Sequence, residues 1–295
     1  MSRRSGTTSA DIQQNCRPIL KLGVIDVRSR KPLAMNALFL HVDACIYCGD
    51  SRPPLTREHV LPRGLGGNEA PDGLSNALVL QNASCQSCQK ITQRIEEACL
   101  VAMMGPGRAR LGLRRKDRSR NTTVAHMDRH DGTSEDREVA WDDVPGAIVI
   151  PSFYEAPILT GAPVPEFPPC DYQIHVVAPS RTVPEDARRI GVPLAADSRM
   201  FARMLGKIGL GFAVAGLGRQ GYEPLVRDLI LNGSFQHGLV GGFAGTSRVE
   251  PQTTSLHALR LVTNDRLPGR FIIAEIRLFA EFDGPTNYVV VGRWQ

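Results

Sequence analysis

The sequence has no run of 18 consecutive apolar residues, which is about the length that a membrane-spanning helix requires. Residues 1–14 contain Arg and Ser but no apolar segment, so we expect no secretory signal there. The absence of a membrane-spanning run and of a secretory signal predicts a cytoplasmic protein without a membrane partner. No internal repeat is apparent.

A strong charge of one sign is also missing. The chain has 35 Lys and Arg against 30 Asp and Glu, a formal net charge of +5. This balance is compatible with a polyanionic partner but does not require one.

The cysteines do not form an even set, as a small secreted disulfide framework normally would. Of the 7 cysteines, four lie in two Cys-x-x-Cys pairs, and Cys16, Cys99 and Cys170 are left over. An odd count with metal-type spacing favours a reducing compartment.

Length and composition predict two domains, because 295 residues with 42% hydrophobic content can form more than one core. We expect an α+β protein in which a small zinc-stapled module precedes a larger α+β domain with an antiparallel sheet. The segment 19–27 is either a strand of the second domain or a brace on the first. The predicted units are a disordered tail (1–16), the zinc module (17–104), a basic polar linker (105–143) and the C-terminal domain (144–295).

Several stretches have the periodicity of regular elements. Phe201, Met204, Leu205, Ile208 and Phe212 recur at spacings of three and four and predict a helix over 198–216. Three glycines weaken that helix unless close packing requires them. Strands are predicted over 147–153, 172–177, 256–263, 270–282 and 287–292.

The two Cys-x-x-Cys pairs are Cys45 with Cys48 and Cys85 with Cys88. Two such turns supply the four thiolates of a closed tetrahedral zinc site. We therefore predict one structural Zn²⁺, which ties both ends of the intervening segment.

Between the pairs, 56–61 is predicted as a short strand that ends before Pro62, and 77–80 as a second strand. From Gln89 onward the apolar residues Ile91, Ile95, Ala98 and Ala102 have helical spacing. The local order is strand, loop, strand, helix.

Three stretches of this region carry a resemblance: CIYCG (45–49), TREHVLPRGLGG (56–67) and CQSCQKITQRIEE (85–97). Together they resemble the HNH endonuclease family, the zinc-stapled ββα-metal or His-Me finger nucleases, and in particular its bacterial members. The segments KIGLGFAVA (207–215) and IRLFAEFDGPTNYVVVG (276–292) are similar in character to the tail of that subtype.

The resemblance implies roles for particular residues. His59 would be the general base that activates water, and Glu58 would be a ligand of Mg²⁺ or another divalent ion. Asn76 is the best match to the asparagine that orients the base, with Asn82 as its rival. Gln89 stands where the family has His or Asn, and it is a weaker ligand. Gln93 and Glu96 share its helix face and would lie near the site.

The resemblance also implies a function, hydrolysis of phosphodiester bonds in DNA, with RNA not excluded. The alternative is a zinc-dependent module that is catalytically weak or inactive and only binds nucleic acid or a protein. Gln89 favours this alternative. Basic residues that either contact phosphates or form a solvated surface are Arg57, Arg63, Arg114, Arg115, Lys116 and Arg118.

Overall fold

The computed structural model describes residues 16–25, 39–52, 54–66, 78–113, 122–180, 185–192, 194–246, 252–253, 255–264 and 270–295. The fold is α+β with antiparallel sheets, as predicted. The predicted tail up to residue 15, Asn76 and the basic residues of 114–120 lie outside the described part of the chain.

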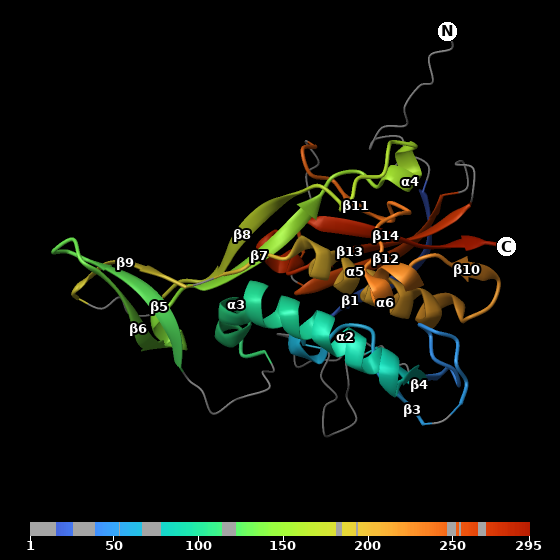
Figure 1. The fold of residues 1–295 in the computed structure, drawn as a ribbon, viewed down its shortest axis with the longest axis horizontal. Helices are drawn as coiled ribbons and strands as arrows, with labels where there is room; N and C mark the ends of the chain where they lie inside the picture. Colours follow the sequence, from blue (N-terminus) through green and yellow to red (C-terminus); the bar gives the residue numbers. More distant parts are fainter. Residues whose placement is uncertain are drawn as a thin grey trace, which may run out of the picture.

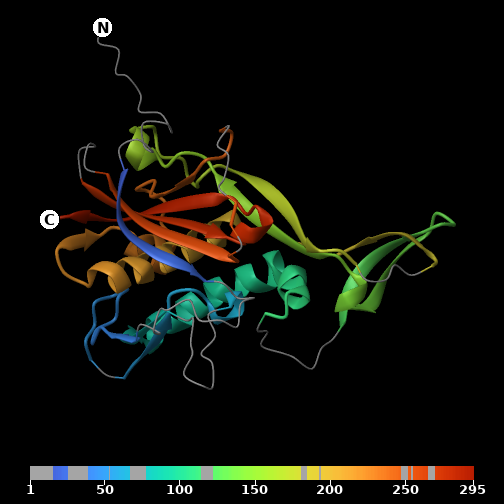
Figure 2. The same cartoon turned by 180° about the vertical axis from the view of Figure 1, so that it is seen from behind.

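The largest sheet has six strands, in the order β1-β12-β13-β14-β10, with β11 also paired to β14. All of its pairings are antiparallel. The segment whose place the sequence left open forms β1 at the edge of this sheet, beside β12; it is labelled in Figure 1 and seen in full, in blue, in Figure 2. The strands are β1 (Cys16–Ile25), β10 (Tyr222–Pro224), β11 (Val240–Gly242), β12 (His257–Asn264), β13 (Phe271–Leu278) and β14 (Thr286–Trp294).

The predicted strand over 270–282 ends earlier than expected. β13 stops at Leu278, and a 3-10 turn, Ala280–Phe282, follows. Phe279 between them has a φ of 52°, in the left-handed region that strands do not use.

Helix α5 (Ser198–Leu217) lies against this sheet and agrees with the prediction. It begins where the side chain of Asp197 accepts a hydrogen bond from the Met200 N–H at 3.0 Å. Close packing accounts for its glycines: a Cβ on Gly209 would lie 2.8 Å from Val291, and one on Gly211 would lie 3.2 Å from Val60. The helix therefore contacts the sheet on one side and the segment after β3 on the other.

The region between the Cys-x-x-Cys pairs forms β3 (Leu55–His59) and β4 (Val79–Cys85), which pair antiparallel, followed directly by helix α2 (Gln86–Ala98). β2 (Phe39–His41) pairs with β4 in parallel. A π-helical turn, Cys99–Met103, continues α2. The predicted order of strand, strand and helix is present, and α2 begins three residues before Gln89.

The range 105–143, for which the sequence predicted a linker, contains α3 (Gly105–Arg110), β5 (Thr122–Arg129), β6 (Ser134–Ala140) and a 3-10 turn (Trp141–Asp143). β5 pairs with β6 and with β9 (Ala187–Gly191). Figures 1 and 2 show this three-stranded sheet as an arm that projects away from the other elements. Its polar strands enclose only a small core, made of Ala125, Met127, Val139, Val144 and Ala187.

The ribbon of β7 (Gly146–Phe153) and β8 (Cys170–Ala178) connects this arm to the large sheet. Two short helices, α4 (Pro157–Thr160) and α6 (Arg227–Asn232), pack on the same body. Outside the arm, buried apolar residues from 45–113 and from 148–291 form one continuous core.

By length and composition, α5 is the single helix of the described residues that is apolar enough to cross a membrane, but 72% of its most apolar window is buried inside the protein. Such burial is typical of the core helix of a soluble protein.

Candidate metal centre and adjacent cavity

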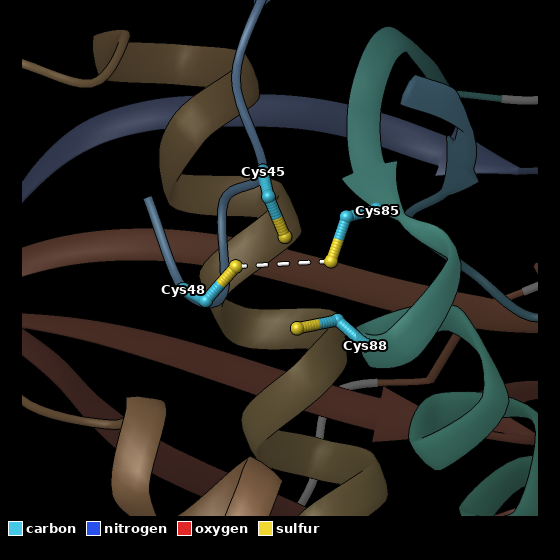
Figure 3. A group of neighbouring side chains, drawn as sticks. All are labelled: Cys45, Cys48, Cys85 and Cys88. Carbon is cyan, nitrogen blue, oxygen red and sulfur yellow. Dashed lines mark hydrogen bonds between the residues drawn. The ribbon is translucent and has the colours of Figure 1, made fainter. Parts of the chain in front are cut away.

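The four cysteines of the two Cys-x-x-Cys pairs converge on one point (Figure 3). Their sulfur atoms all lie within 4.8 Å of one another, and the Sγ atoms of Cys48 and Cys85 are 3.7 Å apart. A tetrahedral zinc site with Zn–S bonds of about 2.3 Å separates its sulfurs by about 3.8 Å. The cluster could therefore hold a metal ion such as zinc, as the sequence predicted.

Each pair is presented by a different local structure. Cys45 and Cys48 lie in a tight turn, in which the Gly49 N–H donates to the Cys45 carbonyl at 2.8 Å and Gly49 has a φ of 81°. Cys85 ends β4 and caps α2, and Cys88 lies in the first turn of that helix. A helix N-terminus favours the thiolate form that a metal ion requires.

The thiols differ in how readily they lose a proton. Burial raises the pKa of both Cys48 and Cys88 above the usual value. Burial acts in the same direction on Cys85, but hydrogen bonding to the backbone of Cys88 and to the neighbouring thiols outweighs it and lowers the pKa of Cys85. Binding of a metal ion must therefore release protons from the cluster, and its affinity must rise with pH.

A cavity of about 450 Å³ opens beside the end of β3. Strand β3 and the turn after it contribute one side of the cavity, and α2 contributes the other. Its lining includes most of the described residues to which the resemblance gave a role. The lining residues are Arg57, Glu58, His59, Arg63, Gly64, Gln89, Thr92, Gln93 and Glu96.

Glu58 and His59 both reach this cavity although successive residues of a strand point to opposite faces. The pairing of β3 with β4 is irregular between Thr56 and Glu58, and the strand ends at His59. In a regular strand, adjacent side chains could not serve one site. The irregular pairing and the end of the strand allow Glu58 and His59 to do so.

Glu58 is already paired with a cation. The ammonium nitrogen of Lys207, on α5, lies 2.8 Å from a carboxylate oxygen of Glu58 and 2.8 Å from one of Glu96. The same ammonium donates to the backbone carbonyl of His59. The side chain of Lys207 is 1% exposed and that of Glu58 is 6% exposed, whereas that of Glu96 is 22% exposed and forms the solvent-facing edge of the cluster.

The protonation of these groups follows from burial and mutual charge. Burial raises the pKa of Glu58, and the charge of Lys207 opposes that effect. For Lys207, burial acts to lower the pKa, but the charges of Glu58 and Glu96 outweigh it and the pKa is raised. Burial raises the pKa of Tyr47, and the same two carboxylates raise it further. Lys207 is therefore a charged ammonium at any physiological pH.

The residues that the resemblance offers for a catalytic divalent ion do not fit that ion as the side chains lie. One oxygen of Glu58 and one of Glu96 hold the Lys207 ammonium, whose positive charge repels a second cation. Gln89 lines the cavity, but an amide oxygen is a weak partner for Mg²⁺, which prefers carboxylates and water.

Two further buried side chains hold the turn that follows His59. Arg108 donates to the Gly64 carbonyl at 2.7 Å, and His257 Nε2 donates to the Leu65 carbonyl at 2.8 Å. Arg108 falls in the range predicted as a linker, and no motif in the sequence points to a role for His257. No local pattern identifies these contacts, because Gly64 is 44 residues from Arg108 and Leu65 is 192 residues from His257.

The remaining predicted residues are spread out. Arg57 and Arg63 are exposed and line the cavity. Asn82, the rival of Asn76, lies on β4 and donates its side-chain amide to Asp43 at 2.9 Å, so it does not line the cavity. Asn76, Arg114, Arg115, Lys116 and Arg118 lie outside the described residues.

No protein-family model, curated protein or solved structure matches this chain.

Proposed function

We propose that this chain is an HNH-type endonuclease that hydrolyses phosphodiester bonds in DNA at the cavity beside β3. The observation that carries the proposal is the position of His59. His59 is half-buried and ends β3, the first strand of the antiparallel pair β3 and β4, and helix α2 follows β4 directly. His59 lines a cavity that Arg57 and Arg63 also line.

The chemistry assigned to the site needs a base and positive charge. Neutral His59 would take a proton from the water that attacks phosphorus, while the bond from phosphorus to the leaving oxygen breaks and that oxygen takes up a proton from solvent. Arg57 and Arg63 would offset the negative charge that collects on the phosphate oxygens. No step in this mechanism uses a divalent ion bound by Glu58.

The cysteine cluster supports the same proposal through its position. Cys85 and Cys88 lie at the start of α2, the helix whose next turns contribute Gln89, Gln93 and Glu96 to the cavity. A structural Zn²⁺ bound there would fix the start of α2 relative to the turn that carries Cys45 and Cys48. In this account zinc shapes the site and takes no part in the reaction.

A second candidate is the non-cleaving module that binds nucleic acid or a protein. The pairing of Glu58 with Lys207 favours it, because this pairing competes with a role for Glu58 as a metal ligand.

A cleavage assay separates the two candidates. Purified zinc-loaded protein is incubated separately with supercoiled plasmid, single-stranded DNA and single-stranded RNA. Each substrate is tested with Mg²⁺, with Mn²⁺ and, in a separate reaction, with a chelator that removes free divalent ions. The nuclease proposal predicts nicked or linear plasmid with wild-type protein. Zinc-loaded wild-type protein that binds plasmid but leaves it intact under every condition supports the binding module.

A further inference from the structure

We propose that Lys207 is a positioning residue of the candidate site: its buried ammonium holds the end of β3, through Glu58 and the His59 carbonyl, against Glu96 of α2. The inference rests on the proposed function for its catalytic consequence. Its structural part can be tested without any nuclease activity.

The ammonium of Lys207 has a complete set of partners. A lysine has three N–H donors. The near acceptors are one carboxylate oxygen of Glu58, one of Glu96 and the carbonyl oxygen of His59, and the Val60 carbonyl lies further away at 3.5 Å. Since all three donors are used and the side chain is buried, Lys207 does not reach a substrate in the cavity. It can act on the reaction only through the residues that it holds.

The cluster joins three elements that are far apart in the chain. Glu58 belongs to β3, Glu96 to α2 and Lys207 to α5. Lys207 and Gly211 are one helical turn apart, and Gly211 permits close contact with Val60, the residue after His59. The backbone on both sides of the His59 side chain is thus held from α5.

This arrangement gives a role to the segment 207–215, whose similarity to the tail of the subtype implied no activity. Lys207 is its first residue, and Gly209 and Gly211 set the depth at which α5 packs between the sheet and β3. The C-terminal part of the chain therefore contributes directly to the candidate site.

Lys207 also takes the place that the resemblance gave to a divalent ion, as the cation that neutralises Glu58. Two carboxylates and one ammonium leave the buried cluster with one negative charge. Removing the ammonium leaves Glu58 buried without its cation, whereas removing the charge of Glu58 as well relieves that penalty.

The experiment compares Lys207→Met, Glu58→Gln and the double variant Glu58→Gln/Lys207→Met with wild type. Arg203→Met is the matched control, because Arg203 lies one turn earlier on α5 and donates to the Ile230 carbonyl on α6, away from the cavity. Urea unfolding of zinc-loaded protein gives the coupling between Lys207 and Glu58. Plasmid cleavage at varied DNA and Mg²⁺ concentrations gives kcat, KM and the Mg²⁺ requirement.

We expect the double variant to lose less stability than the sum of the two single variants, because the two residues act as a unit. We expect Lys207→Met to lower kcat by about 10²-fold with little change in KM, since misplacement of a catalytic group has about that effect. Because Glu58 binds no divalent ion in the proposed mechanism, any dependence of cutting on Mg²⁺ should be the same in wild type, Lys207→Met and Glu58→Gln. Arg203→Met should keep the wild-type kcat.

Additive losses of stability would overturn the buried cluster itself. A coupled pair combined with wild-type kcat in Lys207→Met would overturn the positioning role and leave Lys207 a stabilising residue. Faster cutting of Lys207→Met at low Mg²⁺ would show that the ammonium only competes with a metal ion, which also contradicts the proposal. If wild-type protein does not cut at all, the proposed nuclease function and the positioning role fail together, while the unfolding data still decide whether the cluster exists.

Discussion

His257 Nε2, on β12, lies 2.8 Å from the carbonyl oxygen of Leu65 in the turn after His59. The other ring nitrogen, Nδ1, accepts a hydrogen bond from the Phe279 N–H at 3.1 Å. These partners satisfy a neutral imidazole with its proton on Nε2. The large sheet thus fixes one end of the turn that lines the cavity.

The first prediction concerns the pH dependence of stability. Burial lowers the pKa of His257 to about 4, although the Leu65 carbonyl acts in the opposite direction. A histidine whose pKa is lowered by folding stabilises the native state above its unfolded pKa of about 6.5, and this contribution is lost as the pH falls toward 4. The free energy of unfolding should drop by on the order of 3 kcal/mol over this window because of His257 alone.

Urea unfolding of wild type and of His257→Gln at several pH values between 7 and 4 measures this contribution. The variant should be less stable at pH 7, and its stability should fall less steeply with decreasing pH. Protonation of other groups and release of zinc affect both proteins alike. Parallel curves would contradict the assignment of a neutral, buried His257.

The second prediction concerns the metal centre. Purified protein should contain one zinc ion per chain, and Cys85→Ser should lose it, because a hydroxyl is a poor substitute for a thiolate ligand. Metal binding contributes about 10–16 kcal/mol to folding in zinc-finger peptides, so the variant should lose much of its stability. Elemental analysis and thermal unfolding with and without chelator measure both effects.

Cys170→Ser is the control for the metal centre, because Cys170 lies on β8, outside the cluster. It should retain one zinc ion. Equal zinc content in both variants would exclude Cys85 as a ligand.

The third prediction concerns DNA binding. If Arg57 and Arg63 contact phosphates, changing both to Gln should weaken binding of duplex DNA and reduce the slope of log K against log salt by about 0.9 per lost contact. Arg188→Gln on β9 is an exposed control in the arm. An unchanged slope in the Arg57 and Arg63 double variant would remove these residues from the DNA interface.

The same measurement tests whether the second basic set contacts DNA or forms only a solvated surface. The residues changed together in that variant are Arg114, Arg115, Lys116 and Arg118.

Local patterns predicted the parts of the structure that depend on local physics. The spacing of Phe201, Met204, Leu205 and Ile208 predicted α5, and the two Cys-x-x-Cys turns predicted a cluster that could hold zinc. The antiparallel sheet followed from apolar runs bounded by turn residues. In each case a short segment carries its own signal.

The missed features depend on partners far away in the chain. Lys207 lies in an apolar helix, where a single lysine normally indicates a solvent-facing position, and its acceptor on His59 is 148 residues away. Arg108 stands at the start of a basic run for which the sequence left open a solvated segment or a phosphate-contacting arm, yet it is buried and holds Gly64. The strands of the arm were missed because β6 is polar along most of its length and packs on a very small core.

The proposed role of His59 as the base of a nuclease can be tested by the initial rate of cleavage of supercoiled plasmid. The proteins compared are wild type, His59→Ala and the control His130→Ala, an exposed histidine after β5. We expect His59→Ala to lower the rate by about 10²–10⁴-fold with unchanged zinc content and DNA affinity, while His130→Ala cuts like wild type. A zinc-loaded His59→Ala protein that binds DNA and cuts as fast as wild type would contradict the role of His59 as the base.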